Sequence, residues 1–357
     1  MKKYILFAIS FNYPPPRLSA NKSIYKYAKM YFPDTKMLAA NKLNDDESII
    51  SANIKASGLI SRESIYSLKL LSYIIRNRKK ISCVYLLSPI WLCQVPLIAA
   101  RILGIKTIFD IRSAPITSNK LKNFVLMSLD RLTFLFSSNI TSHNSVLIEK
   151  KYGKRYLNKL VELPLGFEGD IKPVLSDRTK PYKFILPTTI DKERRIELIC
   201  DAFVGMPDMH LYLYGDGGEY ENIKAQYSKH TNIHLMGSIP YNELMQKLPS
   251  YDYGIAFIPR MDYYEYQPAL KSIEYIGAGL PVIATNTHGN RVYIDKSNGL
   301  LIDDTTEALK ESLQKICTTS YDRLSIHNNA MKYTWGDITK KTFERLGLFN
   351  MPINKEV

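Results

Sequence analysis

The chain has 357 residues, of which 45% are hydrophobic and 23% are charged. This length predicts two domains rather than one compact core, and the composition excludes a disordered chain. The net charge of +14 belongs to the first half: residues 1–170 hold 26 Lys and Arg against 11 Asp and Glu, whereas residues 171–357 hold 22 against 23. A one-sided basic excess indicates an anionic partner, either a membrane surface or a nucleic acid, or else a surface that only keeps the protein in solution.

The N-terminus begins like a signal peptide, with a short basic start and an apolar run at residues 4–9. That run is short and no small-residue cleavage site follows it, so we expect a buried strand. The most apolar later stretch, residues 89–104, is shorter than the roughly 20 residues of a membrane-spanning helix and contains two prolines, so we expect no such helix. The four cysteines form no CxxC pair and are expected to be reduced thiols, which predicts a cytoplasmic protein.

The first half alternates short apolar runs with segments of helical periodicity. This alternation predicts an α/β domain with a parallel sheet covered by helices on both faces. The expected strands are residues 4–9, 83–88, 106–111, 138–143 and 159–164. The expected helices are residues 23–32, 64–80, 89–103 and 123–136.

A second domain follows the polar, proline-containing segment 168–183, which we interpret as a linker. The same alternation then returns. The expected strands are 184–189, 209–215, 232–237, 253–258, 281–285 and 299–303, and the expected helices are 195–203, 220–228, 241–248, 269–278 and 306–317. Two doubly wound, Rossmann-like domains would bind a ligand where their strands end, across a cleft, so an enzyme is the leading class.

The last segment, residues 320–346, has a helical pattern with no strand after it. We therefore expect an N-terminal domain over 1–170, a C-terminal domain over 171–330, and a segment 331–357 whose helix crosses back toward the N-terminal domain. Such a helix could tie the two domains together.

Lys271 and Glu274 share one face of a helix predicted to start after Pro268. A lysine in the first turn opposes the helix dipole, unless an anion such as phosphate binds at that helix end. A carboxylate one turn later can accept hydrogen bonds from the two hydroxyls of a ribose. The pair therefore suggests a nucleoside-diphosphate site, although the spacing alone favours an ordinary intrahelical ion pair.

The segment Pro-x-x-Lys-x-x-Glu-Tyr followed by GAGLPVIAT, residues 268–285, resembles the donor-binding segment of retaining GT-B glycosyltransferases of the glycosyltransferase 4 / group 1 family. Residues 195–224, 232–259 and 332–346 are similar to further elements of that family, and the first half resembles it more loosely. The resemblance covers nearly the whole chain. It implies two Rossmann-like domains facing a cleft and a nucleoside-diphosphate-sugar as donor.

The family's binding residues fall on matching positions of this chain. Arg194, with Arg195 beside it, matches the basic phosphate ligand, Lys271 matches the phosphate lysine, and Glu274 matches the ribose carboxylate. Further donor-binding candidates lie in the glycine-rich turn, near the base, before the helix and at its start: Gly215, Ile239, Glu265 and Leu270. Side chains and amides would then neutralise the diphosphate in place of a metal, with no other cofactor.

The sequence departs from the family pattern at several positions. Tyr266 stands where many relatives have a sugar-binding glutamate, and Thr189 replaces a basic residue. The first loop lacks the usual glycine pair, so Arg17 and Ser19 are expected to contact phosphate only weakly.

On the catalytic side, Arg112 falls where many relatives have a histidine. Asp110 or Arg112 could organise the transferred sugar or the acceptor. An ordinary salt bridge at the strand end explains the two residues equally well.

Other signals favour no rival class. No Asp-x-Asp occurs, GDGGEY at 215–220 does not fit a dinucleotide fingerprint, and no nucleic-acid module is present. His230 and His234 have no apparent third ligand, so no metal site is expected. The basic helix at 67–80 is interpreted as core-facing, while contact of the whole basic domain with an anionic membrane remains a hypothesis.

These observations predict a bacterial, cytoplasmic, retaining and metal-independent glycosyltransferase of the hexosyltransferase type. It would move a sugar from a nucleoside-diphosphate-sugar to a glycan or lipid-linked acceptor in surface polysaccharide or lipopolysaccharide biosynthesis, at the inner face of the membrane. Two alternatives stay open: a nucleotide-sugar 2-epimerase of the same fold, and a catalytically inactive GT-B binding protein.

Overall fold

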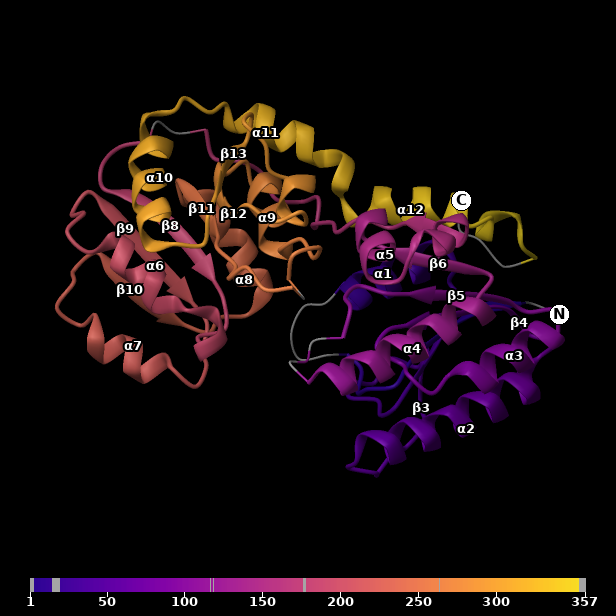
Figure 1. Ribbon diagram of the computed structural model, residues 1–357. Helices are drawn as coiled ribbons and strands as arrows, with labels where there is room; N and C mark the ends of the chain where they lie inside the picture. The colour runs from indigo at the N-terminus through magenta and orange to yellow at the C-terminus, as the bar shows by residue number, and fades with distance from the viewer. Residues whose placement is uncertain are drawn as a thin grey trace. The chain divides into compact units, whose positions relative to one another are not determined.

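The chain folds into two compact units. A computed structural model describes residues 3–14, 20–115, 117, 119–175, 178–262 and 264–352. The first unit comprises Met1–Pro164 and Trp335–Val357, and the second comprises Leu165–Thr334. Each unit is a parallel sheet with helices packed on its two faces (Figure 1).

The sheet of the first unit has the strand order β3-β2-β1-β4-β5-β6-β7, and every pair of neighbours is parallel. All six residues of its interior strand β1 are buried, because helices cover both faces and leave no position for a polar side chain. The strands are β1 (Tyr4–Ile9), β2 (Lys36–Ala39), β3 (Ile49–Ser51), β4 (Ile81–Leu87), β5 (Lys106–Asp110), β6 (Asn139–Ser142) and β7 (Leu160–Glu162).

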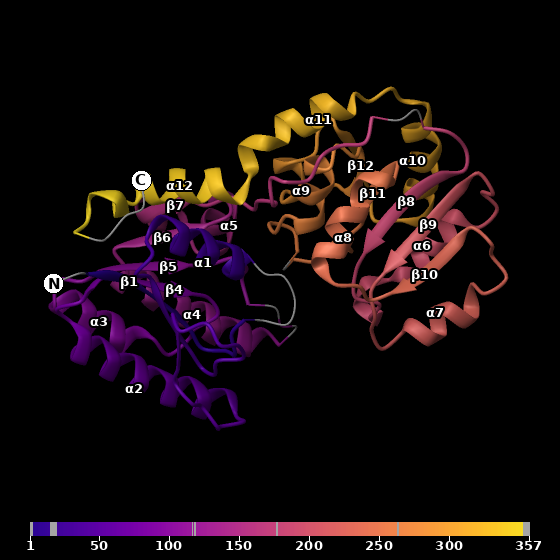
Figure 2. The same cartoon turned by 180° about the vertical axis from the view of Figure 1, so that it is seen from behind.

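The helices of the first unit form two layers. The layer of α2 (Leu59–Asn77), α3 (Gln94–Ile102) and α4 (Lys120–Phe136) lies on one face of the sheet, with α3 packed against both neighbours (Figures 1 and 2). The other face carries α1 (Ala20–Tyr31) and the C-terminal helix α12 (Trp335–Arg345), which pack against each other. The short helix α5 (Ser145–Lys151) links β6 to β7.

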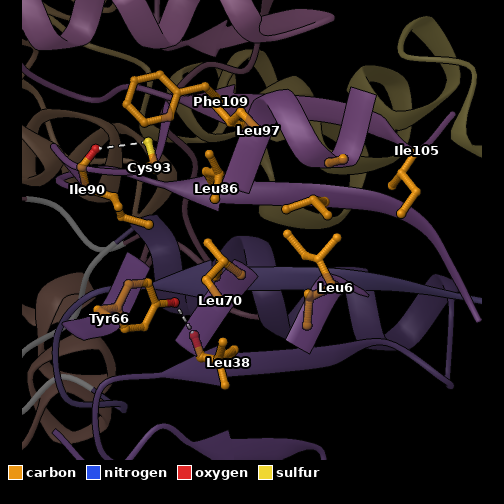
Figure 3. Packing of buried hydrophobic residues seen from close by; sticks show 14 of the residues in the cluster. Leu6, Leu38, Tyr66, Leu70, Leu86, Ile90, Cys93, Leu97, Ile105 and Phe109 are labelled. Atoms are coloured by element: carbon orange, nitrogen blue, oxygen red, sulfur yellow. Dashed lines mark hydrogen bonds between the residues drawn. The ribbon is translucent and has the colours of Figure 1, made fainter. Parts of the chain in front are cut away.

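The main core of the first unit lies between the sheet and the layer α2–α4 (Figure 3). Leu6 and Leu86 from the sheet meet Leu70 and Leu97 from the helices, and all four are buried. Tyr66 is fully buried, and its hydroxyl donates a 2.7 Å hydrogen bond to the carbonyl of Leu38, which satisfies its polar atom inside the core.

The sheet of the second unit has the order β10-β9-β8-β11-β12-β13, again parallel throughout. The chain order reverses between β8 and β11, and ligands of doubly wound sheets bind beyond the strand ends at such a reversal. The strands are β8 (Tyr182–Pro187), β9 (Met209–Tyr214), β10 (Ile233–Gly237), β11 (Tyr253–Ala256), β12 (Val282–Thr285) and β13 (Gly299–Ile302). The helices are α6 (Ile196–Phe203), α7 (Tyr220–Gln226), α8 (Tyr241–Lys247), α9 (Leu270–Gly277), α10 (Thr306–Thr318) and α11 (Arg323–Ala330).

The predicted fold class, two doubly wound parallel sheets, is confirmed. Strands β2 and β3 were not predicted, because segments of four and three residues are too short to show periodicity. The chain passes between the units at 164/165 and 334/335, a few residues from the expected 170/171 and 330/331. Over the described ranges, no helix is both long and apolar enough to cross a bilayer.

Candidate functional site

Helix α9 carries the two residues that the sequence singled out. Its N-cap residue, Ala269, has no side-chain acceptor, so no side chain caps the first turn of the helix. Lys271 lies in this first turn and Glu274 lies one turn later. Asn290 fixes the helix start, because its Oδ1 accepts hydrogen bonds from the Ala269 amide and the Ser272 hydroxyl, both at 3.3 Å. The helix end therefore keeps free amide groups beside a lysine, an arrangement suited to phosphate.

The two charged groups of α9 are both held away from their ordinary charge states. Burial and, to a lesser extent, the positive charge of Arg194 lower the pKa of Lys271 to about 7, while Glu274 partly opposes the shift. Burial raises the pKa of Glu274 to about 7, against the opposing effects of Tyr241 and Lys271. Among the described residues, Lys271 and Glu274 do not form a close ion pair. An anion near Lys271 would restore its charge.

Arg194 and Arg195 follow β8 but face different partners. Arg194 donates from Nε to the hydroxyl of Thr189 at 3.4 Å, and its guanidinium lies 5.3 Å from the ring centre of Tyr264. Arg195 has a left-handed backbone with φ of 50°, and its exposed side chain lies 3.9 Å from a carboxylate oxygen of Asp304. The structure therefore brings Arg194, and not Arg195, into the electrostatic neighbourhood of Lys271.

Gly215 lies where β9 ends and packs against the loop after β8. Its φ of +144° suits glycine, and a Cβ atom there would lie 1.8 Å from the carbonyl oxygen of Thr188. The neighbouring Gly217 is also close to Ile190, since a Cβ atom there would lie 2.5 Å from the Ile190 carbonyl oxygen. Close backbone packing thus accounts for these glycines, and a direct donor contact by Gly215 stays a prediction.

The loop after β10 approaches Glu274. Ile239 is partly buried in this loop, and two residues later Tyr241 opens helix α8. The Tyr241 hydroxyl donates a 3.0 Å hydrogen bond to Oε1 of Glu274. Sequence reasoning missed Tyr241, since nothing local in the sequence links it to a residue 33 positions away.

Glu265 is engaged with a neighbouring loop. Its Oε1 lies 2.7 Å from Nδ1 of His288, and its Oε2 lies 3.9 Å from Nε of Arg260. The ring of Tyr266, at the position where relatives have a glutamate, lies 5.3 Å from the His288 ring. His288 was not predicted from the sequence. A donor contact by Glu265 stays a prediction, and the structure adds a half-exposed imidazole beside it.

In the first unit, the buried Asp110 and the partly buried Arg112 form a hydrogen-bonded ion pair. Arg112 donates from Nε and Nη2 to the two Asp110 oxygens at 2.7 and 2.8 Å, and from Nη1 to the Leu163 carbonyl at 2.6 Å. The Thr141 hydroxyl donates to Asp110 at 2.7 Å, and Asp110 has no exposed surface. These contacts join the ends of β5, β6 and β7, which fits the salt-bridge alternative, while a catalytic role stays a prediction. The expected weak phosphate contacts, Arg17 and Ser19, lie outside the described residues.

Comparisons with known proteins agree with this architecture. Residues 203–345 match the family described as Glucosyltransferase 3-like, C-terminal domain. The O-antigen biosynthesis glycosyltransferase WbnH of Escherichia coli is 25% identical over 146 residues, which cover 40% of each chain. The chain therefore matches about two fifths of the length of this curated relative.

Two solved structures share the fold over nearly the full chain. HepE of Anabaena, in complex with UDP, has a TM-score of 0.69 at 14% identity and covers 98% of this chain and 100% of its own. The lipopolysaccharide outer core galactosyltransferase WaaB, in its apo form, has a TM-score of 0.71 at 13% identity, with 98% and 100% coverage. Residues 203–345 are thus similar to a glucosyltransferase-like domain, and nearly the whole chain shares the two-domain GT-B fold of these structures.

Proposed function

We propose that this protein transfers a sugar from a nucleoside-diphosphate-sugar to a glycan or lipid-linked acceptor in bacterial surface polysaccharide assembly. The observation that carries the proposal is the start of α9, where Lys271, near Arg194, stands beside the uncapped first turn and above the buried Glu274. The name of WbnH, an O-antigen glycosyltransferase, and the UDP bound to HepE support the same substrate class.

In this proposal the second unit stabilises the leaving group. The bond between the anomeric carbon and the phosphate oxygen breaks, and negative charge develops on the departing diphosphate. Lys271, Arg194 and the free amides of α9 are preorganised donors for that charge, so they would act most strongly in the transition state. The acceptor hydroxyl oxygen would form the new bond to the anomeric carbon, and its proton would pass to the departing diphosphate oxygen.

Glu274 would hold the nucleoside. Its carboxylate can accept hydrogen bonds from both ribose hydroxyls, and the bond from Tyr241 fixes its orientation. The loop with Ile239 would then contact the base. Glu265 and His288 stand close to the position that contacts the sugar in many relatives, and we propose that they contribute to the choice of donor sugar.

Retention of the anomeric configuration and independence of metal are further parts of this proposal. Cationic side chains and helix amides offer the charge neutralisation that a metal would otherwise supply. The first unit would receive the acceptor, with Asp110 and Arg112 as candidates for organising it.

A binding screen tests the donor site. UDP, GDP, ADP and CMP are added to the full chain, first without and then with Mg²⁺, while thermal unfolding is followed. A nucleotide at one hundred times its dissociation constant should stabilise the protein by about 2.7 kcal/mol. Lys271→Ala, Glu274→Ala and Arg194→Ala should abolish or strongly reduce this shift, whereas Arg195→Ala, on the neighbouring arginine, should leave most of it.

Four results would contradict the proposal. No shift with any nucleotide, from a folded protein, would favour an inactive binding protein, as would a Glu274→Ala variant with full function. A requirement for Mg²⁺ would overturn metal independence. Conversion of the donor without any acceptor would instead identify a nucleotide-sugar epimerase.

A further inference from the structure

The outer surface of helices α2, α3 and α4 exposes an unusual amount of apolar side chain. Twenty-one large hydrophobic residues of the described chain are exposed, and fourteen of them lie between Leu59 and Leu135 on these helices and the turn after α3. The second unit exposes only five over its described residues. Ile60, Ile102 and Phe124 are 76%, 80% and 65% exposed. An apolar surface of this extent on one helical layer indicates an interaction site.

The apolar residues form stripes that face away from the core. On α2, Tyr66 and Leu70 point into the core of the first unit (Figure 3). Leu68 and Ile75 on the same helix are exposed. On α3 the exposed stripe recurs at three- and four-residue spacing, and α4 repeats the pattern over its whole length. The exposed members on these two helices are Val95, Ile98, Ile102, Leu121, Phe124, Val125, Leu132 and Leu135. A helix that is apolar on two sides needs a second partner besides its own core.

The same surface is positively charged and shows no carboxylate. Residues 51–136 contain thirteen Lys and Arg but only three Asp and Glu. All three acids, Glu63, Asp110 and Asp130, are at least 96% buried. The exposed cations on the layer and its turns are Lys69, Arg76, Arg78, Lys79, Lys80, Arg101, Lys120 and Lys122. The surface therefore combines exposed apolar side chains with positive charge, and residues 51–136 place no exposed carboxylate on it.

A hollow of ≈ 330 Å³ lies within this surface, between the end of α2 and α3. Its lining is Ile75, Ala99, Ile102 and Leu103, with Arg78 as its one charged residue. An apolar hollow beside a guanidinium offers separate places for a hydrocarbon chain and for a phosphate.

We propose that the layer α2–α4 is a docking surface for an anionic phospholipid bilayer, in which the apolar stripes enter the interface and the cations contact lipid phosphates. Apolar burial and attraction to anionic lipid are the two forces that hold a surface of this kind on a membrane. A second copy of the chain fits less well, because a two-fold contact would set the same cations against each other. A nucleic acid would leave the apolar stripes without a partner.

Vesicle sedimentation tests the docking surface on the full chain, without nucleotide or acceptor, so the result does not depend on transferase activity. Phosphatidylcholine vesicles are compared with vesicles that also contain phosphatidylglycerol. The apolar variant is Ile60→Asp with Ile102→Asp and Phe124→Asp. The charge variant is Lys79→Glu with Lys80→Glu. Met30→Asp, on α1 at the opposite face and 49% exposed, is the matched control.

We expect wild type and Met30→Asp to bind the anionic vesicles and to bind the neutral ones at least fivefold more weakly. The apolar variant should lose about tenfold or more in affinity. The charge variant should lose about 25-fold or more, because each of its two cations contributes roughly fivefold near an anionic surface. Equal binding by the apolar variant and its control, or no binding by wild type, would overturn the proposal. So would sedimentation velocity that shows a dimer broken by the apolar variant, with no lipid bound.

Discussion

The two units each contain a charged pair at the strand-end side of a parallel sheet, and the two pairs differ in how they are satisfied. In the first unit, Asp110 and Arg112 bond to each other through two short hydrogen bonds, and the remaining contacts go to Thr141 and Leu163. In the second unit, Lys271 and Glu274 feel each other's charge, but Glu274 accepts from the neutral Tyr241 and Lys271 lies near a second cation.

This difference separates a structural pair from a binding site. A buried pair whose hydrogen bonds are complete gains nothing from a ligand, because no polar atom is left to satisfy. A partly buried lysine with a lowered pKa, beside an arginine, can still gain from binding an anion. Charge state and hydrogen-bond partners, rather than the residue types, therefore support our proposal that the second unit binds the donor.

The largest expected effect comes from breaking the hydrogen-bonded ion pair of Asp110 and Arg112. Asp110→Asn should lower the free energy of unfolding by about 3 kcal/mol, because it leaves Arg112 partly buried without its counter-charge. Urea denaturation measures this loss. The matched control is Glu149→Gln in the same unit, which removes a more exposed, 3.5 Å pair with Lys154 and should cost less than about 0.5 kcal/mol.

The same variant distinguishes the two roles of Asp110. If the pair is structural, nucleotide binding by folded Asp110→Asn stays at the wild-type level. A variant with unchanged stability but no sugar transfer would instead establish a catalytic role for Asp110.

A smaller effect is expected from the pH dependence of stability that Lys271 and Glu274 produce. Burial moves the pKa of Glu274 from 4.5 up to about 7, so its contribution to stability is full below pH 4.5 and is lost as pH rises to 7. The pKa of Lys271 moves from 10.5 down to about 7, so its contribution is full above pH 10.5 and is lost as pH falls to 7. The pair therefore stabilises the folded protein least near pH 7.

Replacing the pair by neutral residues reveals this minimum. The double variant Lys271→Met with Glu274→Gln should be more stable than wild type by about 2 kcal/mol at pH 7. The gap should narrow at pH 5 and at pH 9, in urea denaturation without ligand. A gap that is independent of pH would show that these groups are not perturbed as described.

The smallest expected effect comes from losing the hydrogen bond that Tyr241 donates to Glu274. Tyr241→Phe should weaken nucleotide binding by about 1 kcal/mol, roughly fivefold, because Glu274 loses its orienting partner. Calorimetric titration measures the change. Tyr227→Phe is the control, since it removes a 2.7 Å bond to Asp201 within the same unit, and it should leave nucleotide affinity unchanged. Equal losses in both variants would argue against a role for Tyr241.

The sequence predicted most of the architecture. All six strands of the second sheet and five of the seven strands of the first were expected near their observed positions, because buried parallel strands are continuous apolar runs. The start of α9 was also placed correctly, since Pro268 marks it and the spacing of Lys271 and Glu274 sets their common face.

The contacts between distant segments could not be predicted in the same way. Tyr241 and His288 join the site through loops that meet only after the sheet has formed, and neither residue lies in a recognisable local pattern. The basic helix expected to face the core does so along one side, but neighbouring residues on its other side are exposed. Periodicity identifies an apolar stripe but not which of two stripes the core covers.

By itself, the sequence determined the two doubly wound sheets and the candidate donor residues of α9, because hydrophobic period and helix-start chemistry are local properties. Only the tertiary structure decided which charges are satisfied. In the folded protein Asp110 and Arg112 bond to each other, whereas Lys271 and Glu274 form no close ion pair among the described residues. The fold also exposes a second apolar surface on α2–α4. The physical reason is that burial and hydrogen bonding depend on neighbours that the chain brings together only when it folds.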